Sequence, residues 1–515
     1  MSPAAQGGGE GSESELGRRA PRARARFDWL VAHDRAALVA LQLLVVLVVY
    51  ASGFRAVSDD DYARVVIAQE LVHTPKLDPS GTSWLPLPFW IQGAAMAIFG
   101  PSLEVARAVA IASALGCTLL IHRAALLLGA RRDAAFVGTA LAIALPWSAR
   151  LAIATVPEQL VAALCLYGVA TLTPGASPKQ RLLGAASLFA AALSRYEPWI
   201  IAGLFALGSL RDSRRARLEE RPLRDTLTLL ASALIALAGP VLWSLWNAEV
   251  HGSAVHYLHR VAAYKSQVDG GQIALRIFEY PLALLRAEPE LLVLFAVVLV
   301  RWWPDRHERR ALRGYLQPGA VLVVFVLLLV GLSVRGGAPT HHPERALHVV
   351  HLFLALLTAR LGLEALAEGR LGRRLVVGTA LALALTMPFV RGWWLYRESF
   401  AERSREIAMG RELAERVPRG ELVLVETIDF GYFALQAASG RPESVKPEGR
   451  VDPVHGGAPM LPHALAIRAR LRGASYVVGR APRRPEDRAR ALAEGLELVV
   501  ETEGWVLWKI GARSS

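Results

Sequence analysis

Long apolar runs, separated by short arginine-rich segments, alternate along most of the chain. Three of these runs carry no charged residue; they cover residues 36–54, 226–248 and 317–334 and contain 19, 23 and 18 residues. A helix of about 20 apolar residues is long enough to cross the roughly 30 Å hydrocarbon core of a bilayer. The pattern therefore predicts a polytopic α-helical membrane protein rather than a water-soluble one.

The arginine clusters predict how these helices are oriented. Basic residues concentrate in segments 131–132, 211–224, 301–313 and 370–374, and basic loops usually face the cytoplasm. Placing these segments and the N-terminus in the cytoplasm predicts about 11 transmembrane helices, with the C-terminus outside. The predicted spans are 37–53, 103–127, 134–149, 157–173, 182–194, 198–211, 226–246, 281–300, 317–333, 346–362 and 375–391.

Three segments depart from a simple span. Segment 87–99 is apolar but too short to cross a bilayer, so we expect an interfacial or re-entrant helix there. The stretch 182–210 is interrupted at 195–197, and two short spans keep the following arginine-rich loop inside. Three charged residues also interrupt the predicted span at 281–300.

Composition divides the chain into three parts. Residues 1–35 are rich in Gly, Ser, Glu and Arg and are expected to form a disordered cytoplasmic tail. Residues 36–394 form the transmembrane domain, whose first external loop covers 54–101. Residues 395–515 contain strand-like runs, the last two flanking a hairpin turn at 503–504, and predict a small external α/β domain. The expected strands are 422–425, 475–478, 496–500 and 505–508.

The net charge of +13 does not indicate a nucleic-acid partner. Only 5 of the 58 basic residues are lysines, and most arginines lie in short clusters between apolar runs, where they orient helices. The two cysteines, Cys117 and Cys165, lie inside apolar runs and are interpreted as small core residues. The expected surroundings are therefore membrane lipids.

The first external loop opens with three consecutive carboxylates, Asp59, Asp60 and Asp61. Their mutual repulsion at the membrane edge is expected to raise the pKa of at least one of them, which suits a general base. In a simpler interpretation, Ser58 or Asp59 caps an interfacial helix, and the remaining carboxylates favour its N-terminal dipole. Trp84 follows later in the same loop, in an aromatic and proline-rich segment.

Two breaks between later spans carry polar side chains on the same predicted side. Glu158 follows a proline at the start of one span, where the alternative is an ordinary first-turn helix residue. Arg195, Tyr196 and Glu197 separate the two short spans, where the arginine and the glutamate alternatively form an ordinary interfacial ion pair.

Two further segments complete this set of candidate residues. They supply Arg260, Lys265, His342, Glu344 and Arg345. His348 and His351 follow in the next span, and a zinc site is one reading of these histidines. Hydrogen-bonding histidines are the commoner arrangement at a membrane boundary, so we predict no metal site. Because all these features share one side of the membrane, we expect a polar cavity there that binds a charged lipid head group.

The order and spacing of these motifs resemble the GT-C membrane glycosyltransferases. The acidic residues after the first span, the Trp84–Trp90 segment and Arg107 resemble the opening of the protein O-mannosyltransferase-like and aminoarabinose-transferase-like branch, glycosyltransferase family 39. Glu158 after its proline and the His-Pro-Glu-Arg segment ending at Arg345 resemble later motifs of related enzymes. The chain departs from these patterns in having three aspartates, and Ala346 where an aromatic residue is usual.

The resemblance implies a GT-C-like catalytic domain that transfers a sugar from a polyprenyl-phosphate donor to a glycan, lipid or protein acceptor at the outer face of the cytoplasmic membrane. One aspartate would be the base of an inverting reaction, with Asp60 as the first candidate and Asp59 and Asp61 as alternatives, and Glu158 would assist it. The implied donor-phosphate ligands are Arg195, Arg260, Lys265 and Arg345, and the implied substrate-binding residues are Trp84, Tyr196, Glu197, His342 and Glu344.

The resemblance requires no cofactor, although a divalent cation (Mg or Mn) between an aspartate and the phosphate is compatible with it. A transporter or flippase for a lipid-linked substrate is the main alternative, but its polar groups would be expected near the membrane midplane. A non-catalytic scaffold that presents the C-terminal domain is a third alternative, which leaves the outer carboxylates unexplained.

Overall fold

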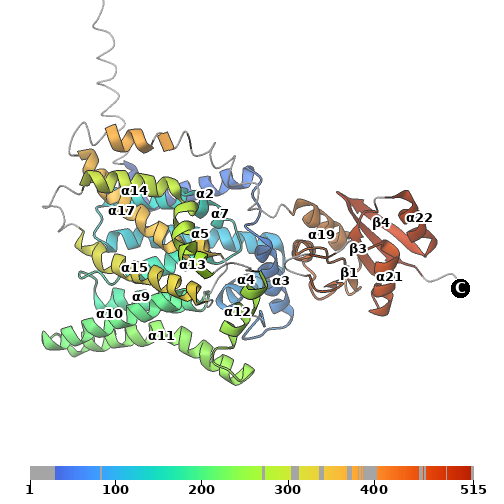
Figure 1. Cartoon of the computed structure of the whole chain (residues 1–515), viewed down its shortest axis with the longest axis horizontal. Helices are drawn as coiled ribbons and strands as arrows, with labels where there is room; N and C mark the ends of the chain where they lie inside the picture. Colours follow the sequence, from blue (N-terminus) through green and yellow to red (C-terminus); the bar gives the residue numbers. More distant parts are fainter. Residues whose placement is uncertain are drawn as a thin grey trace, which may run out of the picture.

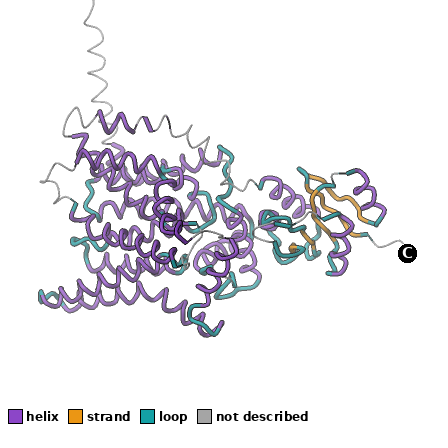
Figure 2. The backbone as a smooth tube through the Cα atoms, in the orientation of Figure 1, coloured by secondary structure: helices purple, strands orange, loops and turns teal. Residues whose placement is uncertain are grey.

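The computed structural model describes residues 29–81, 84–268, 273–302, 312–335, 342–367, 374–380, 382–383, 386, 403–451, 456–457, 460–482 and 484–511. A helical bundle occupies one end of the long axis and a small sheet domain the other (Figure 1). In the part of the chain that the structure describes, strands occur only in the small domain, at the right of Figure 2. Residues 1–28 of the predicted tail at 1–35, and nearly half of the predicted span at 375–391, lie outside the described residues.

The bundle packs helices that are adjacent in the sequence, such as α10 and α11, and helices that are far apart in it, such as α6 and α17; α10 and α11 run along the long axis (Figure 1). Its helices are α2 (Asp34–Ala51), α5 (Leu103–Leu127), α6 (Arg132–Ala144), α7 (Pro146–Leu151), α8 (Glu158–Ala170), α9 (Pro178–Ala192), α10 (Pro198–Leu218), α11 (Leu223–His251), α13 (Ile273–Ala287), α14 (Pro289–Trp302), α15 (Arg313–Val334) and α17 (His348–Ala367). Small buried residues such as Ala124, Ala135 and Ala185 let these helices approach closely.

Among the described residues, four helices are long and apolar enough to cross a membrane: α2, α5, α11 and α15. Large side chains on their outer faces are exposed, among them Leu47 on α2, Leu234 on α11 and Leu327 on α15, each more than 60% accessible. Exposed apolar surface on this scale is expected where lipid replaces water. These helices confirm the predicted polytopic helical fold, whereas the count of 11 spans stays a prediction.

Two predicted spans are wrong in detail because each is a broken helix. The predicted span at 134–149 breaks between α6 and α7, and the one at 281–300 breaks between α13 and α14 at Glu288. The two breaks meet, since Glu288 is fully buried and accepts a hydrogen bond of 2.7 Å from the backbone N–H of Trp147 at the start of α7. As predicted, the chain leaves helical structure between α9 and α10, at 195–197. The bounds of α4 are also those predicted, 87–99.

Three shorter helices and one single turn lie at the end of the bundle that faces the small domain. They are α3 (Asp59–His73), α4 (Leu87–Phe99), α12 (His256–Val268) and α16 (Pro343–Ala346). Figure 1 shows α3 and α4 between the bundle and the small domain. The predicted first external loop and the C-terminal domain therefore lie on the same side of the bundle.

The small domain is a five-stranded α/β sheet with strand order β2-β1-β3-β5-β4. Its strands are β1 (Val423–Val425), β2 (Val445–Pro447), β3 (Tyr476–Arg480), β4 (Leu496–Thr502) and β5 (Trp505–Ile510), and its helices are α19 (Ser404–Arg416), α20 (Tyr432–Ser439), α21 (Pro462–Leu471) and α22 (Pro485–Ala493). β1 pairs in parallel with β2 and β3, whereas β5 is antiparallel to β3 and β4. The predicted hairpin is confirmed, with positive φ at both Glu503 and Gly504.

Candidate active site

The three aspartates form the first turn of α3, but they have different neighbours. Ser58 is the N-cap residue, and Asp61 closes a capping box by accepting hydrogen bonds at Oδ2 from the backbone N–H groups of Val57 (3.0 Å) and Ser58 (3.2 Å). The Oδ1 atom of Asp61 also accepts a 2.8 Å bond from the backbone of Thr155. The capping interpretation is thus confirmed for the start of this helix, and Asp61 joins it to the loop before α8.

Burial raises the pKa of Asp61 from 3.8 to about 6, although its backbone hydrogen bonds and the charge of Arg345 act in the opposite direction. A carboxyl whose pKa rises on folding stabilises the fold most below its unfolded value, and the contribution is lost as the pH rises through the folded value. The melting temperature of the wild type minus that of Asp61→Asn should therefore fall between about pH 4 and about pH 6. A constant difference over this range would contradict the assignment.

Asp60 faces the bundle, where it contacts Arg345. The Nη1 atom of Arg345 donates to Asp60 Oδ2 at 3.2 Å, and its Nη2 atom donates to the Ser58 hydroxyl at 2.9 Å. About a third of the Asp60 side chain is accessible (34%), whereas only 4% of the Arg345 side chain is. Asp60 is therefore the carboxylate of the three that combines access from outside with a buried cation.

Glu158 lies behind this pair and is almost fully buried. Its Oε1 atom accepts a hydrogen bond from Nη1 of Arg195 and lies 3.5 Å from Nη1 of Arg345. Its Oε2 atom is buried without a hydrogen-bond partner among the described residues. Although burial disfavours charge, Glu158 and Asp60 raise the pKa of Arg345, so this guanidinium stays charged.

The break between α9 and α10 holds a second carboxylate on Arg195. The Nε atom of Arg195 lies 3.1 Å from both oxygens of Glu197, which is itself buried. Burial alone disfavours the charged guanidinium, but Glu197 and Glu158 raise the pKa of Arg195. The predicted ion pair of Arg195 and Glu197 is therefore present, and it extends to Glu158 as one buried network.

Arg64 belongs to the same cluster, although no sequence motif indicated it. Its guanidinium is buried, lies 4.4 Å from the ring centre of Trp84, and has Nε and Nη1 atoms without hydrogen-bond partners in the described part of the chain. Burial lowers its pKa, whereas Glu158 and Asp60 raise it. The available signal was its position four residues after Asp60, one helical turn along an otherwise apolar segment.

The aromatic candidates line the outer edge of the cluster. Trp84 stacks at 6.3 Å on Phe89 and covers Arg64. Tyr196 stacks on Tyr257 of α12 at 4.5 Å and 7°, with Trp199 edge-on to both. The first pair of rings thus covers Arg64, and the second group follows Arg195 in the sequence.

The remaining candidates lie around this centre at different depths. Asp59 points to the C-terminal domain, where Arg403 donates to both of its oxygens at 2.9 Å. His342 Nδ1 lies 3.3 Å from Glu344 on α16, next in sequence to Arg345. Arg260 is exposed and donates to the carbonyl of Gly81 at 3.3 Å. The side chain of Lys265 lies outside the described part of the structure.

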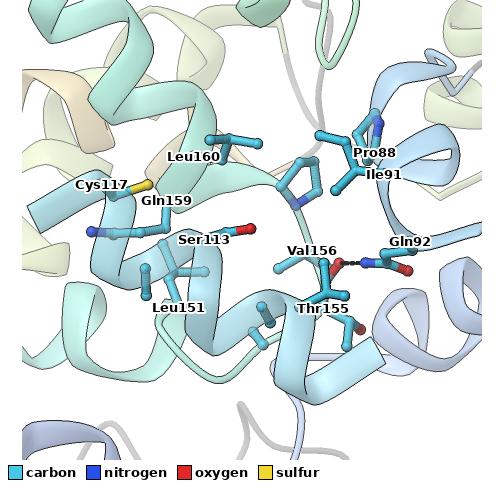
Figure 3. Close-up of a pocket in the computed structure, with 15 residues that line it drawn as sticks. Pro88, Ile91, Gln92, Ser113, Cys117, Leu151, Thr155, Val156, Gln159 and Leu160 are labelled. Carbon is cyan, nitrogen blue, oxygen red and sulfur yellow. Dashed lines mark hydrogen bonds between the residues drawn. The ribbon is translucent and has the colours of Figure 1, made fainter. Parts of the chain in front are cut away.

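Two apolar pockets border the charged cluster. One lies beside Arg195 and Arg345 and has Val161, Phe325 and Val349 in its wall. The other lies between α4, α5 and α8, where Gln92 donates a 3.0 Å hydrogen bond to the carbonyl of Thr155 (Figure 3). The cluster therefore has apolar space next to its cations.

The histidines of α17 are hydrogen-bonding residues within the bundle. His348 is fully buried, with Nε2 at 2.7 Å from Gln159 Oε1, and His351 Nε2 lies 3.1 Å from the carbonyl of Leu284. Within the described ranges, no group of three or more His, Cys, Asp or Glu side chains is arranged to hold a metal ion.

Solved structures share this architecture at low sequence identity. A crystal structure of ArnT from Cupriavidus metallidurans bound to undecaprenyl phosphate matches with a TM-score of 0.56 and 13% identity, over 93% of this chain and 98% of that one. The oligosaccharyltransferase AglB from Archaeoglobus fulgidus, in complex with an inhibitory peptide and a dolichol-phosphate, matches with a TM-score of 0.50 and 14% identity, over 88% and 70%. Both are GT-C membrane glycosyltransferases. The chain has the GT-C fold.

A third GT-C structure, the Archaeoglobus fulgidus oligosaccharyltransferase in complex with Zn and sulfate, matches with a TM-score of 0.51 and 13% identity, over 87% of this chain and 68% of that one. No protein-family model and no curated relative matches the chain. The GT-C resemblance of the sequence motifs is thus confirmed at the level of the fold.

Proposed function

We propose that the protein is a membrane glycosyltransferase that moves a sugar from a polyprenyl-phosphate donor to an acceptor at the outer face of the cytoplasmic membrane. The observation that carries this proposal is the contact of accessible Asp60 with buried Arg345, beside Glu158 and Arg195. It combines a base that an acceptor can reach with cations suited to a leaving phosphate. The GT-C fold supports the proposal, since the matching ArnT and AglB structures hold undecaprenyl phosphate and a dolichol-phosphate.

Asp60 is the proposed general base. The acceptor oxygen forms a bond to the anomeric carbon while the bond from that carbon to the phosphate oxygen breaks, and the acceptor proton passes to Asp60. Attack from the face opposite the phosphate inverts the anomeric configuration. Asp59 and Asp61 are less suited to this role because Arg403 holds the first and three backbone N–H groups hold the second.

Arg345 and Arg195 are the proposed ligands of the departing phosphate. A guanidinium presents a planar fork of donors that matches phosphate oxygens, and it is worth most in a site from which water is excluded. Both side chains are nearly inaccessible, at 4% and 11% exposure. Glu158 and Glu197 hold these arginines in place. Arg64 contributes further positive charge, and Arg260 and Lys265 are proposed to attract the donor at the outer rim.

The apolar pocket beside the arginines suits the lipid part of the donor. A prenyl chain needs apolar surface next to its phosphate, and Val161, Phe325 and Val349 line an apolar pocket next to Arg195 and Arg345. Trp84 and Tyr196 are proposed to stack on the sugar, with Glu197, His342 and Glu344 as its polar contacts. We propose a mannose-like sugar, or another hexose or a pentose, and a glycan, lipid or protein acceptor.

The residues around Asp60 do not fit a resident divalent cation. The carboxylates of Asp60 and Glu158 both contact guanidinium groups, and Arg64 adds a third buried cation nearby. A metal ion would compete with these arginines for the same oxygens. We therefore expect transfer to persist in the presence of a chelator.

The test is a transfer assay with purified protein in nanodiscs. It uses a panel of radiolabelled polyprenyl-phosphate sugars and a crude membrane-lipid acceptor fraction, with wild type and Asp60→Asn side by side, with and without EDTA. Transfer by the wild type and not by Asp60→Asn supports the proposal and identifies the sugar. Loss of transfer in EDTA would overturn the metal-free mechanism. Absence of transfer by the wild type with every donor would overturn the proposed function.

A further inference from the structure

The C-terminal domain packs directly on α3, the helix that carries Asp60. Ala434 and Ala437 of α20 and Ile407 of α19 are buried in one apolar cluster with Tyr62 and Val65 of α3. This interface is continuous with the core on the membrane side, because Met96 of α4 and Leu103 of α5 belong to the same cluster. The domain and the helix therefore form one packed unit, and Figure 1 shows α3 at the edge of the bundle that faces the small domain.

Directional contacts fix the position of α3 within this unit. The side-chain nitrogen of Gln69 donates to the carbonyl of Ala437 at 2.9 Å and lies 3.3 Å from the carbonyl of Pro101. Gly440 ends α20 with φ at +64°, and a Cβ atom there would lie only 2.7 Å from the Pro101 carbonyl. The C-terminal end of α20 thus approaches the membrane domain as closely as a backbone can.

The strongest polar contact across this interface lies at the first turn of α3. Arg403 donates from Nε and Nη2 to the two oxygens of Asp59, both at 2.9 Å, and from Nη1 to Asp429 at 3.1 Å. Its side chain is only 16% exposed. A two-bond guanidinium–carboxylate pair fixes direction as well as distance, and it ties α3 to two elements of the C-terminal domain.

Asp59 and Asp60 are consecutive residues of one helical turn, so their side chains point about 100° apart around the axis. Asp59 meets Arg403 of the C-terminal domain, while Asp60 meets Arg345 of the bundle. Rotation of this turn by a small angle would move both contacts together. Holding Asp59 from outside therefore also limits where Asp60 can lie.

We propose that Arg403 is a positioning residue through which the C-terminal domain sets the orientation of the first turn of α3, and with it the carboxylate of Asp60. This inference rests on the proposed function of Asp60 as the base. It gives the C-terminal domain a part in sugar transfer that needs no contact with the substrate.

Kinetics of sugar transfer in four variants test this role. Arg403→Gln and Asp59→Asn should each lower kcat about tenfold with little change in KM for the donor, because misplacement of a base affects the chemical step. The double variant should be no slower than the slower single variant, since both changes break one contact. Arg411→Gln, which removes the exposed interdomain pair with Glu104, should match the wild type. A normal kcat for Arg403→Gln, a change in KM alone, or multiplied effects in the double variant would overturn the role.

Hydrogen exchange separates this proposal from the proposed function. Backbone amides of residues 55–66 should exchange faster in Arg403→Gln than in the wild type or Arg411→Gln, whether or not any donor is turned over. Arg403→Lys, which keeps the charge but not the fork, replaces Arg403→Gln if the latter fails to fold. Unchanged exchange in this segment would overturn the positioning role, while absence of sugar transfer by the wild type would overturn the proposed function and leave the effect of Arg403 on α3 to be judged from exchange.

Discussion

Replacing Asp60 with Asn is expected to lower the rate of sugar transfer by about 10³-fold, the usual size of a general-base contribution. The substitution keeps the size of the side chain and an oxygen that can accept from Arg345, which lies 3.2 Å from Asp60. It removes only the ability to take up the acceptor proton. Binding of the donor should therefore persist, because Arg345 and Arg195 still face the phosphate. Single-turnover assays and donor-binding measurements on the same preparation distinguish the two effects.

Glu70→Gln is the matched control for this substitution. Glu70 lies on the same helix, is about half exposed, and lies 3.9 Å from the charged nitrogen of Lys446. Surface pairs of this kind contribute little, so the control should behave as the wild type. If Asp60→Asn transferred sugar at the wild-type rate, the base would have to be sought at Asp59 or Asp61. If it failed to bind donor, its role would be in binding rather than in proton transfer.

The sequence predicted local elements well where local signals decide them. The helices at 87–99 and 103–127 begin and end as predicted, because proline and serine mark their starts and Gly100 follows the first of them. The hairpin at 503–504 was predictable for the same reason. β2 was missed because it has only three residues and ends in proline, so its pairing with β1 is a property of the sheet.

Breaks in helices that depend on distant contacts could not be predicted in this way. At the start of α7, the backbone N–H of Trp147 donates its hydrogen bond to Glu288, which lies 141 residues away in the sequence. The charge at 288 was visible as an interruption, but its partner was not. A buried carboxylate that binds a backbone N–H group is a tertiary feature, and hydropathy alone cannot reveal it.

The membership of the site was largely predictable, whereas the contacts within it were not. The shared side of the membrane brought Asp60, Glu158, Arg195 and Arg345 together as candidates, and the structure gives contacts that join them. The separate neighbours of the three aspartates follow from the rotation of α3, because each residue advances by about 100° around a helix. Arg64 was missed for the same reason, since only the packed helix turns it toward Trp84.

Glu158→Gln is expected to have the largest effect on folding, lowering the free energy of unfolding by about 3–5 kcal/mol, the usual cost of breaking a buried ion pair from one side. Glu158 is 1% exposed, and its negative charge partly neutralises the positive charges of Arg195 and Arg345. A neutral amide leaves these two buried guanidinium groups with one carboxylate fewer. Thermal unfolding in detergent measures the change, with Glu219→Gln as the control because Glu219 pairs with two exposed arginines. A wild-type melting temperature for Glu158→Gln would show that the buried network is not charged as described.

The same variant links stability to the proposed donor site. If the lipid phosphate binds Arg195 and Arg345, it supplies the negative charge that Glu158→Gln removes. Adding polyprenyl phosphate should therefore raise the melting temperature of Glu158→Gln more than that of the wild type, because a ligand that binds the folded state more tightly stabilises it more at the same concentration. Inorganic phosphate at the same concentration should do less, since it lacks the chain that the apolar pocket beside Arg195 would hold. Equal shifts for both proteins would separate Glu158 from the phosphate site and would limit its role to holding the two arginines in the fold.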